Sequence, residues 1–202
     1  MPGPLATAGS IMVRSRSPEL APGRDSCMAH VVFLRGVNVG GHRVFRPSSL
    51  PGQLPELGLV NIGAAGTLVV RQRIGQAALR RSLARCLPFD AEIVICNAQQ
   101  VLNLVGSSIF AGQPMRPDVV RFVTVLSRPP EVLPLLPMEF RHGRRWLVKL
   151  LGQVDCFVFG VYRRHMRTIS YLGRIDRLFD VPVTTRNWNT FGLIAKVLEE
   201  PR

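Results

Sequence analysis

The sequence predicts an α+β fold in which two ferredoxin-like halves pack together and a C-terminal helix follows. Hydrophobic residues make up 47% of the 202 residues, which is enough to bury a substantial core. Secondary-structure signals follow the order strand, helix, strand, strand, helix, strand, which is the order of a ferredoxin-like unit. This order recurs loosely after a proline-containing step at residues 113–117. We therefore expect a first half at residues 28–112 and a second half at residues 117–202.

The first half contains four short runs rich in apolar and β-branched residues. They predict strands at residues 30–34, 59–62, 68–71 and 91–96. An apolar stripe predicts a helix at residues 75–87, and a further helix is expected at residues 98–105. Another helix should begin near residue 47. Because Pro51 and Pro55 interrupt it, we expect a distorted helix or a 3₁₀ turn there.

The second half carries the same kinds of signal. Strands are predicted at residues 119–126, 139–141, 145–151, 154–162 and 181–184, with a hairpin turn at His142 and Gly143. Helices are predicted at residues 130–136, 168–179 and 187–199. In the last of these, Trp188 and Phe191 fall on one apolar face, which predicts that the helix packs on the core.

The net charge of +13 is the strongest compositional signal. Residues 1–27 contribute three arginines and two acidic residues, which leaves +12 on the rest of the chain. Arginine supplies 24 of the 26 cationic side chains, which suits phosphate contacts but also follows from a GC-rich genome. The arginines are scattered and no aromatic residues interleave with them. Nucleic-acid binding is therefore an open alternative that the sequence does not favour.

Other classes of protein find little support. No apolar run reaches the roughly 20 residues of a membrane helix, and residues 1–27 lack the apolar region of a signal peptide. We interpret residues 1–27 as a disordered extension or a misassigned start, and expect a cytoplasmic protein with no membrane partner. The four cysteines form no CxxC pair, so no metal site, cofactor or disulfide framework is predicted. The sequence does not indicate an oligomeric state.

Residues 184–190 are the part of the chain richest in specific chemistry. Thr185 or Asn187 could cap the last helix, and Trp188 is expected to be a core residue. Arg186 would then lie near the positive end of the helix dipole, where a bound anion would be favourable. The alternatives are that Arg186 pairs with Asp176 or Asp180, or points into water. Asn189 is a further candidate ligand contact.

A second candidate segment is the glycine-rich loop at residues 35–41, which follows the first strand. Its backbone amides could form an anion-binding nest beside Arg35 and Asn38, or the loop could be a tight turn without a ligand. The glycine spacing matches neither GxGxxG nor the P-loop. The candidate ligand-binding residues from both segments are Arg35, Gly36, Asn38, Gly40, Gly41, Arg186, Asn187 and Asn189.

The two segments together closely resemble the bacterial family catalogued as domain of unknown function 1697. The resemblance spans about residues 28–199 and implies a cytoplasmic protein with duplicated ferredoxin-like halves and no established activity. The chain departs from the family pattern between the segments. Where the family typically has Ser-Gly-Asn in a strand turn, this sequence has Ala65, Gly66 and Thr67. This departure implies that a shared ligand site would have lost part of its polar wall.

No catalytic constellation is recognisable, and whether the protein is an enzyme is left open. The leading hypothesis is that an anionic or phosphorylated small molecule binds between residues 35–41 and residues 184–190. One alternative is nucleic-acid binding through an arginine-rich face, and another is that both segments are purely structural. The deciding observation is whether Arg186 approaches Arg35 around a common cavity.

Overall fold

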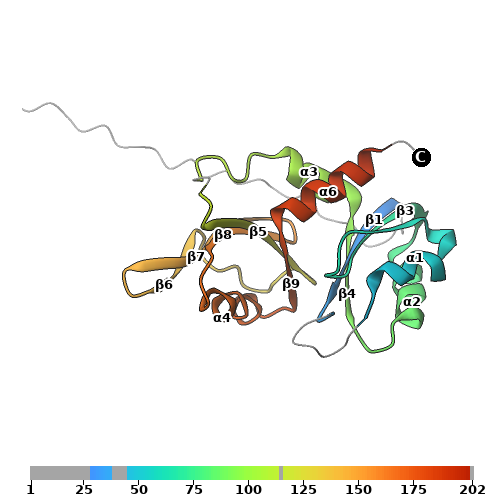
Figure 1. Ribbon diagram of the computed structural model, residues 1–202, viewed down its shortest axis with the longest axis horizontal. Helices are drawn as coiled ribbons and strands as arrows, with labels where there is room; N and C mark the ends of the chain where they lie inside the picture. Colours follow the sequence, from blue (N-terminus) through green and yellow to red (C-terminus); the bar gives the residue numbers. More distant parts are fainter. Residues whose placement is uncertain (1–27, 38–44, 114–115, 201–202) are drawn as a thin grey trace, which may run out of the picture.

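A computed structural model of the protein describes residues 28–37, 45–113 and 116–200. They form an α+β molecule with one four-stranded and one five-stranded antiparallel sheet. Figure 1 shows the sheets side by side, with α3 (Ala98–Gly106) and α6 (Trp188–Glu199) together over the junction. The predicted α+β class and C-terminal helix are confirmed. Residues 1–27 lie outside the described part of the chain.

The first sheet has the strand order β2-β3-β1-β4. Its strands are β1 (Met28–Arg35), β2 (Leu59–Asn61), β3 (Thr67–Ile74) and β4 (Glu92–Asn97). One face packs against α2 (Gln76–Cys86) and against three short turns, η1 (Pro47–Ser49), α1 (Leu50–Gln53) and η2 (Pro55–Leu57). The expected distortion near residue 47 is confirmed: each short turn has a proline at its first or second position, where the missing N–H costs least.

The second sheet has the strand order β6-β7-β8-β5-β9. Its strands are β5 (Val119–Leu126), β6 (Met138–His142), β7 (Arg145–Val154), β8 (Phe157–Arg163) and β9 (Val183–Asn187). Apart from β6 at the edge, its order corresponds to that of the first sheet. The predicted helix at residues 130–136 was wrong, because prolines 129, 130 and 134 supply no backbone donor and the segment is irregular. The second half thus lacks one helix of the expected unit, and a ferredoxin-like duplication stays a prediction.

Two further boundaries differ from the sequence-based expectation. The expected helix at residues 168–179 is two short helices, α4 (Thr168–Leu172) and α5 (Ile175–Phe179), separated by Gly173 and Arg174. The last strand lies at Val183–Asn187 instead of residues 181–184. Its residues pair with β5, with Thr184 opposite Val125 and Arg186 opposite Val123. The two threonines of this segment favour the extended backbone, since β-branched side chains fit a pleated sheet.

One hydrophobic core joins the two halves, while the outer face of each sheet has a core of its own. In the shared core Phe191 of α6 stacks on Phe33 of β1 at 5.8 Å between ring centroids, and meets Phe157 of β8 edge-on at 6.0 Å. Cys96 of β4 and Cys156 of the β7–β8 turn also meet there, with 3.7 Å between their sulfur atoms. Helix α6 therefore buries its apolar face against both sheets, as its predicted periodicity indicates.

Within residues 28–37, 45–113 and 116–200, no helix combines the length and apolar composition needed to cross a membrane.

Candidate functional site

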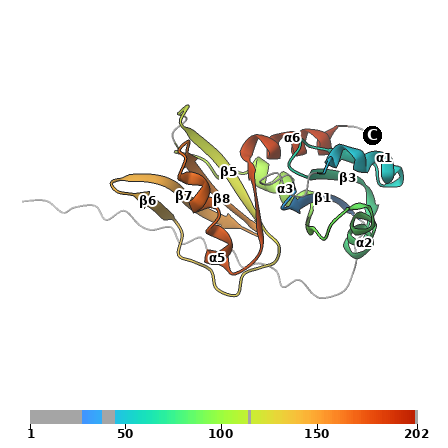
Figure 2. The same ribbon diagram turned by 60° about the horizontal axis from the view of Figure 1, so that its bottom comes forward.

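The chemically dense segment at residues 184–190 is divided between a strand and a helix. Arg186 lies in β9, whereas Trp188 is the first residue of α6. Arg186 directly precedes the N-cap of the last helix, as predicted, but it also belongs to a strand that the sequence did not extend this far. Asn187 is the N-cap of α6, because its Oδ1 accepts a hydrogen bond from the backbone amide of Asn189 at 3.0 Å. Strand β9 runs along the junction between the halves, so its side chains can reach the first sheet (Figures 1 and 2).

Arg186 is 8% exposed and uses all of its hydrogen-bond donors. Its Nε donates to Thr67 Oγ1 at 2.9 Å, and its Nη1 donates to Thr184 Oγ1 at 2.6 Å and to the Thr185 carbonyl at 3.0 Å. Its Nη2 donates to the carbonyls of Leu34 at 2.8 Å and Ala65 at 2.6 Å. Three of these five acceptors belong to the first half of the chain. Arg186 thus attaches β9 to the end of β1 and to the β2–β3 turn.

The charge of Arg186 is buried without an opposite charge. All five acceptors are neutral oxygens, and no ion pair to Arg186 occurs among the described residues. Burial lowers the pKa of Arg186 to about 10, so the side chain remains protonated at neutral pH. This lowering of the pKa corresponds to roughly 3 kcal/mol of burial cost. The expected ion pairs of Arg186 with Asp176 or Asp180, and its exposure to water, were all wrong.

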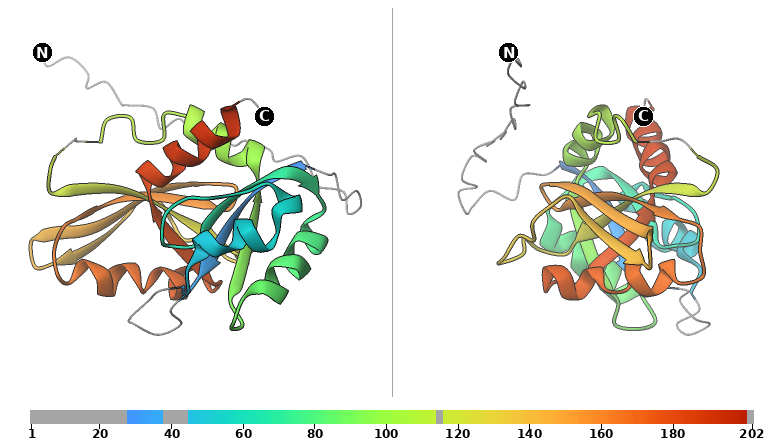
Figure 3. Two further views of the ribbon diagram at one scale, coloured as in Figure 1. Left: turned by 45° about the vertical axis from the view of Figure 1, so that its right-hand side comes forward. Right: turned by 90° about the vertical axis from the view of Figure 1, so that its left-hand side faces the viewer.

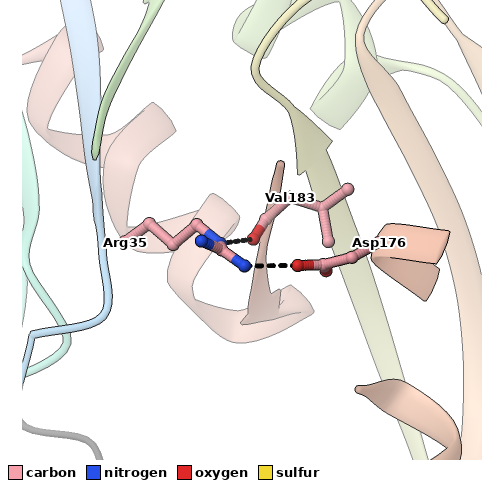
Figure 4. A network of polar contacts seen from close by, with 3 residues as sticks. All are labelled: Arg35, Asp176 and Val183. Atoms are coloured by element: carbon pink, nitrogen blue, oxygen red, sulfur yellow. Dashed lines mark hydrogen bonds and ion pairs between the residues drawn. The ribbon is translucent and has the colours of Figure 1, made fainter. Parts of the chain in front are cut away.

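Asp176 pairs with Arg35 instead. Figure 4 shows the Arg35 guanidinium reaching across the junction, where Nη2 donates to the Asp176 carboxylate and Nε donates to the Val183 carbonyl at 3.0 Å. The side chains of Arg35 and Asp176 are 42% and 32% exposed, so water screens this ion pair. Arg35 and Arg186, one partly exposed and one buried, are therefore among the contacts that hold the first half to the second.

Both arginines border one cavity of about 850 Å³, here called the junction cavity. Its wall includes Arg35, Gly36, Asp176, Arg186 and the β2–β3 turn residues Ala64 and Ala65. Arg35 and Arg186 thus border a common cavity, which the sequence left as the deciding question. The candidate residues Asn38, Gly40 and Gly41 lie outside the described residues.

Asn187 and Asn189 lie at a different place. They border a cavity of about 450 Å³, here called the helix-start cavity, which shares no lining residue with the junction cavity. The remaining lining residues are Arg116, Pro117, Val119, Val120, Arg121, Arg164 and Trp188. The structure thus brings Arg35, Gly36 and Arg186 together, and separates Asn187 and Asn189 from them.

The β2–β3 turn is a part of the site whose role the sequence did not reveal. Gly66 has φ +73°, and a Cβ there would lie 2.8 Å from the Leu34 Cβ, so the turn packs tightly on β1. This turn and the first residue of β3 supply two acceptors for Arg186, the Ala65 carbonyl and the hydroxyl of Thr67, which is fully buried. The unusual residues 65–67 could have pointed to this contact, because they stand where the family pattern is polar. Asp176 gave no local signal.

Comparison with protein families matches residues 28–141 to the family described as "Protein of unknown function (DUF1697)". This chain belongs to that family. The matched region covers more than half of the 202 residues and includes Arg35 and the β2–β3 turn. No curated protein and no solved structure matches the chain. Family membership therefore leaves the function to be argued from the site itself.

Proposed function

We propose that this protein binds a small anionic molecule, preferably a phosphorylated one, in the junction cavity. The observation that supports the proposal is the buried guanidinium of Arg186, which has only neutral acceptors. The cavity wall carries Arg35, Arg186 and one acidic residue, Asp176, so its charge is +1. A volume of about 850 Å³ lies within the range of pockets that hold metabolites. An anion there would offset the cost of burying Arg186.

Arg35 is the residue that can change partner when a ligand arrives. Its ion pair with Asp176 is partly exposed, and such pairs contribute about 0–1 kcal/mol. Asp176 thus competes with an anionic ligand for Arg35, and its negative charge also repels the ligand. Arg186 would contribute its positive potential rather than a direct bond, because its donors are already used. Since Arg186 stays protonated well above neutral pH, its charge gives the affinity no pH dependence between about pH 6 and 9.

A purely structural role is the second candidate, and the five hydrogen bonds of Arg186 favour it. On this hypothesis Arg35 and Arg186 only hold the halves together. The two hypotheses differ in what the removal of Asp176 does. If the cavity binds an anion, a neutral residue at this position strengthens binding; if the arginines are structural, it only weakens the attachment.

The experiment compares Asp176→Asn with Asp180→Asn. Both substitutions remove one negative charge near the end of the second half, but Asp180 is exposed and does not border the cavity. Asp180 has φ +50°, a conformation that asparagine tolerates well. Thermal-shift and calorimetric measurements would use inorganic phosphate, sugar phosphates, nucleoside monophosphates and dicarboxylates.

We expect at least one of these anions to raise the melting temperature of the wild-type protein. Asp176→Asn should bind it about tenfold more tightly, the effect of removing one nearby like charge, while Asp180→Asn binds it as the wild type does. The binding proposal fails if no anion shifts the melting temperature of either the wild type or Asp176→Asn. A cytoplasmic location, where phosphorylated metabolites are abundant, is part of the same proposal.

A further inference from the structure

The helix-start cavity has a strongly positive wall. It is bordered by Arg116, Arg121 and Arg164, and no acidic side chain lines it. The nearest acid in sequence is Asp118, whose carboxylate accepts a hydrogen bond from Arg163 at 2.8 Å. The wall therefore carries a charge of +3, against +1 for the junction cavity.

These three arginines come from chain segments that the fold brings together. Arg116 precedes β5, Arg121 lies within β5, and Arg164 follows β8, the strand beside β5. The backbone amide of Arg164 donates to the Asp118 carbonyl at 2.8 Å, which holds the two strand ends close. Helix α6 begins above the second sheet (Figure 3) and contacts β5. Like charges gathered in this way repel each other, and an anion relieves the repulsion.

The arginines are available for a ligand. Arg116 and Arg164 are exposed, and among the described residues neither side chain has an ion pair or hydrogen bond. Arg121 is half-buried and lies 5.3 Å above the Phe110 ring, and its hydrogen bond within the described part of the chain is a long one, at 3.4 Å to the Gln113 carbonyl. Unlike Arg186, these guanidiniums therefore keep donors that can reach an incoming oxyanion.

An aromatic wall adjoins the basic one. Trp188 lines the helix-start cavity and also a neighbouring hollow of about 310 Å³, which Arg121 and Phe110 border as well. Trp188 is half-buried and braced by Phe191, which stacks on it at 5.9 Å, and by Phe110, which meets it edge-on at 5.0 Å. A fixed indole beside guanidiniums is the combination that binds a base by stacking and its phosphate by charge.

We propose that the helix-start cavity is a second ligand site, which binds a nucleotide unit with its phosphate at Arg116, Arg121 and Arg164 and its base against Trp188. The carboxamides of Asn187 and Asn189 stand at the same wall and can donate to the ribose or the base. A free nucleotide and a nucleotide within single-stranded nucleic acid share this chemistry. The two sources differ in the dependence of binding on chain length and salt.

The test follows the fluorescence of Trp188 itself. The protein has two tryptophans, and Trp146→Phe leaves Trp188 as the only indole. The probes are inorganic phosphate, the four nucleoside monophosphates and a ten-nucleotide single-stranded RNA. Arg121→Gln and Arg164→Gln are made in this background. Arg81→Gln is the matched control, because it removes the same charge from an exposed position on α2, in the other half.

We expect saturable quenching of Trp188 by at least one nucleotide or by the RNA. Arg121→Gln and Arg164→Gln should each weaken it about tenfold, and Arg81→Gln should leave it unchanged. Inorganic phosphate should compete without quenching. Tighter binding of the RNA with a steep loss at high salt identifies nucleic acid as the source, whereas equal affinities identify the free nucleotide.

The proposal is overturned if no probe quenches Trp188, or if all three arginine variants weaken binding equally, which would indicate a general effect of charge. Asp176→Asn separates this site from the junction cavity, because it changes anion binding there and leaves the quenching of Trp188 unaltered. Failure of either proposal is therefore visible independently of the other.

Discussion

The two ends of the segment at residues 184–190 use similar side chains in opposite ways. At the β9 end, Arg186 is buried and all of its donors are bonded to atoms of the protein. At the α6 end, Asn189 is exposed, and the arginines of the helix-start cavity have few or no partners among the residues that the structure describes. The difference shows that density of polar residues does not identify a binding site. Whether the donors are already satisfied decides between attachment of the two halves and recognition of a ligand.

The largest effect is expected when Arg186 is removed. Arg186→Ala leaves the Leu34 and Ala65 carbonyls and two threonine hydroxyls without their donor, and we expect it to lower the free energy of unfolding by about 3–5 kcal/mol. Urea denaturation measures the change. Asn189→Ala at the other end should change stability by less than about 0.5 kcal/mol. Equal losses in the two variants would remove the distinction between the ends.

A second test addresses the turn that receives Arg186. Gly66→Ala places a Cβ 2.8 Å from the Leu34 Cβ on a residue with φ +73°, which produces both a clash and backbone strain. Together they should lower the free energy of unfolding by about 2–4 kcal/mol. Gly63→Ala is the matched control, because it has the same φ of +73° and nothing within 4 Å of the added Cβ. We expect Gly63→Ala to lower the free energy of unfolding by only about 1 kcal/mol. Urea denaturation measures both variants. If they lose the same free energy of unfolding, tight packing of this turn is not what holds the Arg186 acceptors in place.

The smallest effect is expected where the strand becomes the helix. Asn187→Ala removes the cap that accepts from the Asn189 amide and should destabilise the protein by about 1 kcal/mol. Asn187→Asp should restore most of that stability, because aspartate caps equally well. Thermal denaturation of the three proteins provides the comparison. If Asn187→Asp does not restore stability, the Asn187 carboxamide has a role besides capping.

The sequence predicted most strands because apolar and β-branched runs are local signals. It failed at residues 130–136, where prolines outweigh an apolar pattern, and at β9, where pairing with β5 extends the strand through Arg186 to Asn187. The structure places Arg35 and Arg186 at one cavity, an arrangement that the sequence posed only as a question. Their partners were not predicted, because three of the five Arg186 acceptors are backbone carbonyls and Asp176 lies 141 residues from Arg35.

The contact between Cys96 and Cys156 in the shared core offers a way to measure how often the two halves separate. Cys96 belongs to the first sheet and Cys156 to the β7–β8 turn of the second, and Cys96 is only 2% exposed. The contact with Cys156, followed by burial, raises the pKa of the Cys96 thiol, so the reactive thiolate is scarce while the halves are closed. Alkylation of Cys96 must therefore wait for the sheets to separate. Cys86 is half-buried on α2 away from the junction, so its alkylation rate serves as an internal reference. The ratio of the Cys96 rate to the Cys86 rate therefore reports how often the interface between the halves opens.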